Sequence, residues 1–153
     1  FSTSSSAATL PLSIKVCTED LGVDESIASF VLPLGMTINM DGTAIMQVIA
    51  TVFIAGCAGY DLTPIQLVVI ALLALLASVG TPAAPGAGAV ILFTILSGVG
   101  FVNDKALLAY SLILAINRPI EMLVTSLNVV GDATSSVCVA KSEGLLDVDK
   151  FNA

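Results

Sequence analysis

The sequence predicts an all-α membrane protein built from broken transmembrane helices and re-entrant helical hairpins. Of its 153 residues, 56% are hydrophobic and 11% are charged, whereas about 25% of the residues in an average soluble domain are charged. Three long runs carry no charge at all, namely 26–40, 42–60 and 62–103. Clusters of Pro, Gly, Asn or Asp interrupt the helices that apolar runs of this length would otherwise form.

Composition excludes several classes of function. The chain has no His, so a His-based catalytic triad is impossible, and we expect no enzyme. Its 5 basic and 12 acidic residues argue against nucleic-acid binding. The three cysteines, Cys17, Cys57 and Cys138, show no disulfide or metal-binding spacing. Cys57 lies between small residues in an apolar run, so we expect it to be buried.

The run 62–103 predicts a re-entrant hairpin. Its 42 residues would form a helix of about 63 Å, twice the thickness of a bilayer core. Two prolines and three glycines within 80–88 leave arms of 18 and 15 residues, which are short for full spans. Because the break carries no charge, we expect its tip to lie inside the protein at membrane depth. The alternative is two tilted spans joined by a tight turn.

The run 26–60 predicts one broken transmembrane helix of 35 residues, about 52 Å long if it were continuous. Its middle reads Asn39-Met40-Asp41-Gly42-Thr43. In a soluble protein this pentapeptide favours a surface turn. Here the uncharged flanks place a carboxylate within the membrane, where it is costly and indicates a functional site. A break that exposes carbonyls beside Asp41 is suited to a hard cation.

The N-terminal segment 1–18 resembles the later break, because a tip of small residues, Ser4-Ser5-Ser6-Ala7-Ala8-Thr9, precedes a short helix. Alone, such a stretch more often indicates a linker. Charged residues at 19–25 and 104–105 predict solvated connections. The start has no initiator Met, basic region or cleavage site, so we expect the chain to be a piece of a longer polypeptide.

A polar stripe runs along the last predicted helix, 106–143. At about 100° per residue, its polar side chains share a face about 80° wide, and the other faces are apolar. The stripe comprises Asn117, Glu121, Thr125, Asn128, Asp132 and Ser135. Polar groups in lipid must face protein or water, so the stripe should point into the helical bundle.

Two interpretations of this stripe are open. Interhelical hydrogen bonds alone would account for Thr125 and Ser135. They explain Glu121 and Asp132 poorly, because the chain has only 5 cationic residues to pair with carboxylates. Arg118 is the one nearby partner for Glu121. We therefore favour a functional role for both carboxylates, which lie about 16 Å apart along the helix.

Four motifs occur in the order found in the glutamate transporter family, the sodium-coupled dicarboxylate and amino acid symporters. They are Ser4-Ser5-Ser6-Ala7-Ala8-Thr9-Leu10-Pro11, Asn39-Met40-Asp41-Gly42-Thr43, Gly86-Ala87-Gly88 after Pro85, and Asn128-Val129-Val130-Gly131-Asp132. The chain resembles this family over residues 1–144, with a tail at 145–153. The resemblance implies most of an elevator-type transport domain. Its parts are the first hairpin tip and second arm (1–18), the seventh helix (26–60), the second hairpin (62–103) and the eighth helix (106–143).

The same resemblance implies an N-terminal scaffold outside this chain, through which the carrier forms a homotrimer. It implies a multi-pass protein of the cell membrane, inner or plasma, that moves a small molecule together with Na⁺. One Na⁺ would bind the Asp132 carboxylate with the carbonyls of Gly35, Asn39 and Asn128. A second would use carbonyls at Thr37, Ser78, Val79 and Thr81, and a third the side chains of Asn39 and Asp41.

By resemblance, substrate would lie between the two hairpin tips. Its α-carboxylate would meet the Ser6 backbone and Asn128, and its ammonium would meet Glu121 and the Ala84 carbonyl. The remaining pocket residues would be Ser4, Ser5, Thr43, Gly88, Val124 and Thr125.

Three departures from the family pattern affect the expected substrate. Val124 stands where carriers of acidic substrates have an Arg, and an apolar side chain cannot replace a buried Arg–carboxylate pair. Glu121 stands where amino acid carriers have Asp, and Pro82-Ala83 stiffens the second tip. We therefore expect a neutral amino acid. The alternatives are an acidic amino acid or dicarboxylate, with Arg118 as charge partner, and, less favoured, a channel.

Overall fold

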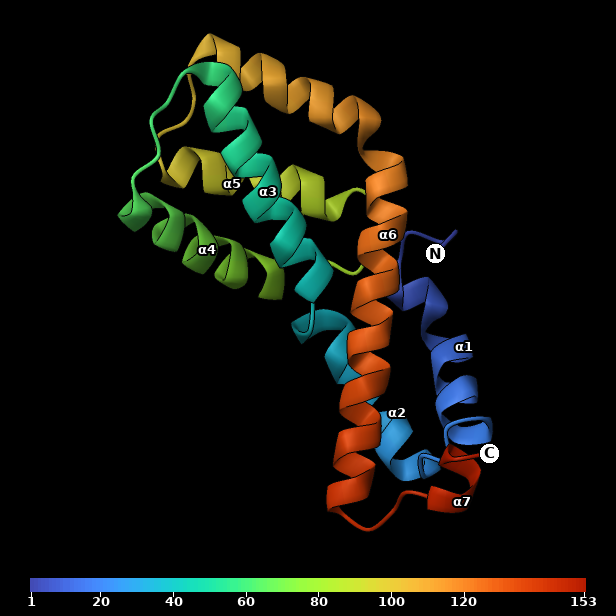
Figure 1. The fold of residues 1–153 in the computed structure, drawn as a ribbon. Coiled ribbons are helices and arrows are strands. Elements are labelled where there is room, and N and C mark those ends of the chain that lie inside the picture. Colours follow the sequence, from blue (N-terminus) through green and yellow to red (C-terminus); the bar gives the residue numbers. More distant parts are fainter.

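The computed structural model describes residues 1–153 and is all-helical (Figure 1), which confirms the predicted fold class. The helices are α1 (Ser6–Glu19), α2 (Glu25–Ile38), α3 (Asp41–Ala58), α4 (Pro64–Val79), α5 (Ala87–Gly98), α6 (Asp104–Ser142) and α7 (Val148–Phe151). A single antiparallel bridge joins Val23 to Leu146, and there is no β-sheet.

Helix α6 connects the two halves of the molecule. It is 39 residues long and contains Pro119, and Figure 1 shows that it changes direction partway along its length. Proline removes a backbone donor and pushes against the preceding turn, so it bends a helix where it stands. The part before the bend lies beside α3 and α5, and the part after it lies beside α1 and α2 (Figure 1).

The larger half has its own apolar core between α3, α4, α5 and the start of α6. Each of these helices contributes a completely buried side chain, for example Ile54, Ile70, Leu92 and Ala106. Burying a Leu or Ile side chain contributes about 1.5–3 kcal/mol. This core fixes α4 and α5 against α3, and thereby fixes where the segment between α4 and α5 can lie.

The smaller half forms around α1, α2 and the end of α6, with a core of Cys17, Val23, Ala28, Leu32 and Ala140. The C-terminal tail closes it, because the Asp24 N–H donates to the Leu145 carbonyl and the Asp147 N–H donates to the Gly22 carbonyl. At the start of α2, the Ser26 hydroxyl and backbone N–H donate to the Asp24 carboxylate and lower its pKa.

Both predicted helix breaks are present. Helix α2 ends at Ile38 and α3 begins at Asp41, so only Asn39 and Met40 separate them. The other break separates α4 from α5, where Pro82 and Pro85 lack the N–H that a continuing helix needs. Gly86 directly before α5 has a φ of +87°, a left-handed conformation that favours glycine.

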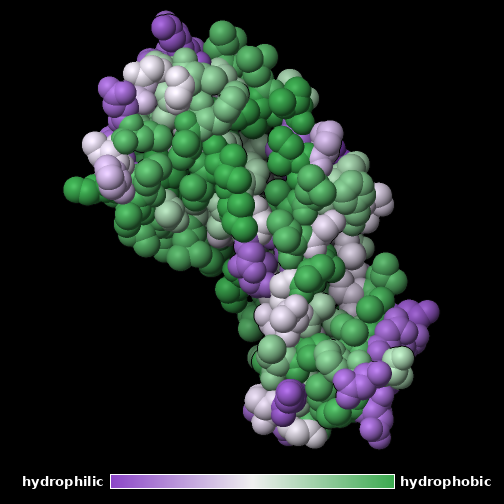
Figure 2. Space-filling model, viewed as in Figure 1, coloured by the Kyte–Doolittle hydropathy of each residue, from purple (hydrophilic) through white to green (hydrophobic).

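The surface is largely apolar. On α4, Ile65 is 77% exposed and Leu76 is 72% exposed. Figure 2 shows hydrophobic residues spread over the larger half, and hydrophilic residues in patches at both ends of the molecule and near its middle. By length and composition, Glu25–Ala58 and Asp104–Ser142 could each cross a membrane, whereas α4 and α5 are shorter.

Two expectations about individual side chains were wrong. Cys57 is exposed on α3, where it continues the exposed positions Ile49 and Phe53 in steps of four residues. Ser135 is also exposed, and Ser136 is buried in its place. The buried face continues from Asp132 in steps of four residues to Ser136 and Ala140, and such steps move about 40° around the helix each time, away from Ser135.

Candidate functional site

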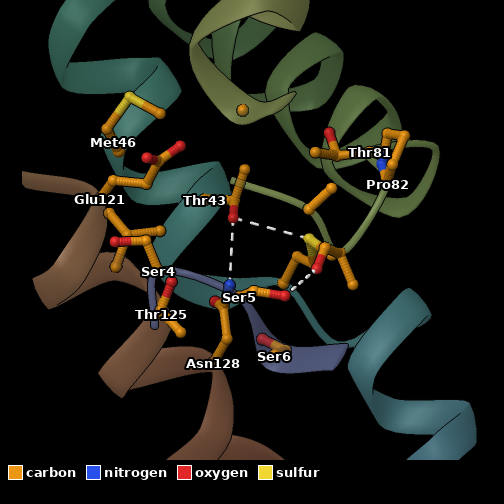
Figure 3. Close-up of a pocket in the computed structure, with 15 residues that line it drawn as sticks. Ser4, Ser5, Ser6, Thr43, Met46, Thr81, Pro82, Glu121, Thr125 and Asn128 are labelled. Atoms are coloured by element: carbon orange, nitrogen blue, oxygen red, sulfur yellow. Dashed lines mark hydrogen bonds between the residues drawn. The ribbon is translucent and has the colours of Figure 1, made fainter. Parts of the chain in front are cut away.

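Four segments that are distant in the sequence meet beside the bend of α6. They are the N-terminal tip before α1, the first turns of α3, the segment between α4 and α5, and the middle of α6. Together they enclose a cavity of about 30 Å³, which Figure 3 shows in close-up. The cavity is lined by all ten residues that were predicted to contact substrate: Ser4, Ser5, Ser6, Thr43, Ala84, Gly88, Glu121, Val124, Thr125 and Asn128.

The N-terminal tip contributes three buried serines. Ser4 is a non-glycine residue in the left-handed region, with φ +50°, a conformation that costs about 1–3 kcal/mol and is concentrated at functional sites. Its Oγ is buried and has no hydrogen-bond partner. Ser5 caps α1 by accepting from the Ala8 N–H, and its own hydroxyl donates to the Ala83 carbonyl over 2.7 Å. The tip before α1 thus touches the segment between α4 and α5.

Asn128 attaches α6 to the start of α3. Its Oδ1 accepts from the Gly42 N–H over 2.9 Å, and its Nδ2 donates to the Thr43 Oγ over 3.1 Å (Figure 3). The break before α3 leaves the Gly42 N–H without an intrahelical partner, as at any helix start. One amide side chain therefore fixes the first turn of α3, which carries Thr43 to the cavity.

Glu121 is the one carboxylate at the cavity. It is 6% exposed, and its Oε2 accepts from the Arg118 Nη1 over 2.9 Å. Its Oε1 accepts from the backbone N–H of Gly86, at the start of α5. The Arg118 side chain is 57% exposed and does not line the cavity. Arg118 therefore reaches the carboxylate from outside and does not itself present a charge to the cavity.

Val124 forms an apolar part of the cavity wall, with 9% of its surface exposed. Met40 and Met46 line the same cavity, and no Lys or Arg does so. A ligand in this space would meet hydroxyls, amides, backbone groups and one carboxylate that is already paired. The cavity thus offers a small ligand one anionic side chain and no cationic one.

Asp132 lies one turn beyond Asn128, the last cavity residue on α6, with 4% of its surface exposed. Its Oδ1 accepts from the Asn39 Nδ2 over 3.0 Å, and no Lys or Arg pairs with it. Gly35 lies directly against it, since a Cβ on Gly35 would be 2.6 Å from Oδ1. The structure therefore brings together Gly35, Asn39 and Asp132, three of the residues predicted to hold Na⁺.

The other predicted cation ligands differ in exposure, and some are buried while others are not. Asp41 is exposed, although its carboxylate lies close to the α6 backbone at Gly131. The side chains of Thr37 and Val79 are exposed. Those of Ser78 and Thr81 are buried, with hydroxyls that donate to the carbonyls of Leu75 and Ala77. The end of α4 lies beside α2 (Figure 1), which brings the residues at the end of α4, Ser78 and Val79, near Thr37 on α2.

The donor set limits the choice of cation. No group of three or more His, Cys, Asp or Glu side chains is assembled anywhere in the chain. Transition metals favour such clusters, whereas backbone carbonyls, amide oxygens and a single carboxylate suit hard cations.

Sequence reasoning missed several cavity residues: Met40, Met46, Pro82 and Ala83 as lining groups, and Thr81, which was assigned to a cation. Met40 lies within a recognised motif, and Met46 is one turn after Thr43 on the same face of α3, so helical spacing could have found it. No sequence pattern indicates the contact between Glu121 and Gly86, because this contact depends on how far the α4–α5 segment extends across the fold.

Known proteins resemble this chain over most of its length. A family model described as the sodium:dicarboxylate symporter family matches residues 1–142. The chain is 41% identical over 139 residues to a putative sodium-dependent excitatory amino acid transporter, glt-4, of Caenorhabditis elegans, covering 91% of this chain and 27% of that protein. It is 44% identical over 131 residues to human excitatory amino acid transporter 2, covering 86% of this chain and 22% of the relative. It thus spans about a quarter of the length of these relatives, and it belongs to the sodium:dicarboxylate symporter family.

Proposed function

We propose that this chain is the C-terminal part of the transport domain of a sodium-coupled symporter for neutral amino acids. The observation that carries the proposal is the cavity wall: one buried carboxylate, Glu121, faces it together with apolar Val124, and no basic residue lines it. The family supports coupling to sodium, and the names of the relatives support an amino acid as substrate. Glu121 would bind the substrate ammonium, and Val124 would contact an uncharged side chain.

Sodium would bind the Asp132 carboxylate with the carbonyls of Gly35, Asn39 and Asn128. The support is electrostatic: Asp132 is buried, has an amide as its one hydrogen-bond partner and has no cationic side chain beside it. A buried charge without a partner is costly, and a cation bound by carboxylate and carbonyl oxygens would remove that cost. Two further Na⁺ sites would use Thr37, Ser78, Val79 and Thr81, and the side chains of Asn39 and Asp41.

Binding of substrate would require the second hairpin to move. A cavity of about 30 Å³ holds roughly two or three water molecules, which is too little for an amino acid. The tip between α4 and α5 would therefore act as a gate, and Na⁺ and substrate would each favour binding of the other through it. The two hairpins would be re-entrant, and the domain would move as an elevator within a homotrimeric, multi-pass protein of the cell membrane.

The experiment is sodium-dependent uptake into proteoliposomes that contain the full-length carrier. Labelled serine, alanine, aspartate and succinate are compared in the parent, in Val124→Arg and in Val124→Met, which adds bulk without charge. We expect the parent to take up the neutral amino acids. Val124→Arg should shift the preference to aspartate by at least roughly tenfold, because a buried charged hydrogen bond contributes about 1.5–3 kcal/mol. Val124→Met should not produce this shift.

Each other outcome contradicts a defined part of the proposal. Aspartate or succinate uptake by the parent would refute the neutral substrate and favour the acidic alternative. Uptake that does not depend on Na⁺ would refute the coupling. A current that does not saturate with substrate would indicate a channel.

A further inference from the structure

The segment between α4 and α5, residues 80–86, is joined to the rest of the fold by few polar contacts. Its other hydrogen bonds stay within residues 77–90. Only two reach outside the second hairpin: the Ser5 hydroxyl donates to the Ala83 carbonyl, and the Gly86 N–H donates to the Glu121 carboxylate. These two bonds come from opposite sides of the cavity, one from the N-terminal tip and one from α6. They hold the segment at its middle, Ala83, and at its C-terminal end, Gly86.

The Glu121 carboxylate makes its two contacts with different oxygens. Oε1 accepts from Gly86 inside the fold, and Oε2 accepts from Arg118, which stands on the outer side with 57% of its side chain exposed. Arg118 is one turn before Glu121 on α6, directly ahead of Pro119. An ion pair of this kind restricts the rotamers of the carboxylate. Arg118 is therefore placed to fix the direction in which Oε1 points.

We infer that the hydrogen bond from the Gly86 N–H to the Glu121 carboxylate, called the latch below, holds the second hairpin tip against α6. Arg118 is the positioning residue that orients this carboxylate. The inference rests on the proposed function in one respect. Because Oε2 is paired with Arg118, Oε1, the oxygen that holds Gly86, would receive the substrate ammonium. The ammonium and the Gly86 N–H would then compete for Oε1. Substrate entry would require the latch to open, and a weaker latch would leave the tip open for a larger fraction of the time.

The length of the Glu121 side chain is the specific feature on which the latch depends. Glu121→Asp keeps the charge but withdraws the carboxylate by one methylene, about 1.5 Å. A hydrogen bond to Gly86 does not survive such a change unless the helix or the tip moves. The shorter carboxylate remains at the cavity wall. This variant therefore distinguishes the effect of side-chain length from the effect of the negative charge.

The opening of the tip can be measured without substrate. Val124→Cys places a thiol on the cavity wall, in a full-length carrier whose exposed Cys57 and Cys138 are replaced by alanine. The rate at which a small neutral maleimide modifies this thiol reports the open fraction, provided that opening and closing are faster than labelling. Cys17 is 1% exposed in the other half of the molecule, and its labelling reveals any variant that unfolds.

We expect Glu121→Asp to raise the labelling rate by roughly tenfold to hundredfold, the effect of losing a charge-assisted hydrogen bond. Ser5→Ala should raise it by a smaller factor, because its bond to Ala83 is between neutral groups. Arg118→Gln should raise it and Arg118→Lys should return it towards the parent rate. Glu19→Asp is the matched control, since Glu19 forms an exposed pair with Lys15 four residues away, and it should change nothing.

A labelling rate in Glu121→Asp equal to that of the parent would overturn the latch. Equal rates in Arg118→Gln and the parent would overturn the role of Arg118. Faster labelling of Cys17 in Glu121→Asp would assign the effect to unfolding and would also overturn the inference. Failure of the proposed function has a different signature: the parent would take up no amino acid with Na⁺, and the labelling comparison would be unaffected, because it contains no substrate.

Discussion

Gly35→Ala tests whether the contact between α2 and Asp132 forms a cation site. A Cβ on Gly35 would lie 2.6 Å from the Asp132 Oδ1 and 3.1 Å from its Cγ. Ordinary contact begins at 3.4 Å, so the carboxylate or the helix must move by about 0.8 Å, the difference between 3.4 and 2.6 Å. The Asn39 Nδ2, 3.0 Å from the same oxygen, must then move or lose its bond. A binding site needs its ligands within about 0.5 Å of their productive positions.

We expect Gly35→Ala to raise the Na⁺ concentration for half-maximal uptake by roughly tenfold to hundredfold, about 1.4–2.8 kcal/mol of binding free energy. The direct measurement is the increase in Tm that Na⁺ produces in the purified full-length carrier. Since a ligand stabilises the folded protein according to its concentration relative to Kd, the variant should need correspondingly more Na⁺ for the same increase. K⁺ at equal ionic strength corrects for general salt effects.

Gly56→Ala is the matched control for this substitution. Gly56 also lies within a helix, α3, and a Cβ there would meet nothing within 4 Å. Alanine is a better helix former than glycine, so the control should be neutral or slightly more stable, by up to about 1 kcal/mol, with an unchanged response to Na⁺. If Gly35→Ala and Gly56→Ala respond to Na⁺ alike, the assignment of a cation to this contact is wrong.

Two further substitutions test the charge and the core. Asp132→Asn keeps the shape of the side chain but removes its charge. It should weaken Na⁺ binding by roughly hundredfold or more, because losing one member of a buried charge pair costs about 3–5 kcal/mol. An undiminished Na⁺-induced rise in Tm would contradict this. Ile54→Ala empties a completely buried position and should lower the free energy of unfolding by about 2–5 kcal/mol. Ile49→Ala, at a position 64% exposed on the same helix, should cost far less in the same denaturation experiment, and equal costs would refute the core assignment.

The helical class and the two breaks could be predicted because each has a local cause. Proline and glycine between α4 and α5 prevent a continuous helix whatever surrounds them. The break at Asn39 and Met40 was predicted from a different signal, a carboxylate between long uncharged runs. The first cause acts within a few residues of its break, and the second is a pattern of charge along the chain, so the sequence contains both in full.

The bend in α6 and the contacts around it were harder to predict. Pro119 was visible in the sequence, but a straight helical wheel treats all positions before and after it as one regular face. That assumption correctly grouped Asn117, Glu121, Thr125, Asn128 and Asp132, all of which are buried. It failed at Ser135, where the buried face has turned around the helix axis. The bond from Gly86 to Glu121 joins residues 35 positions apart, and only the packing of α5 against α3 and α6 determines it.

The two buried carboxylates of α6 differ in a way that accounts for a division of roles. Glu121 has its charge compensated by Arg118 within the fold, so it does not require a metal ion and can exchange one hydrogen-bond donor for another at Oε1. Asp132 has an amide from Asn39 and no cationic side chain, so a cation bound from solution would balance its charge. A charge that is already paired suits a latch and an ammonium site, whereas an unpaired one suits Na⁺. Exchanging the two would fail on both counts. Na⁺ at Glu121 would have to compete with Arg118, and an ammonium at Asp132 would lie about 16 Å along α6 from Glu121.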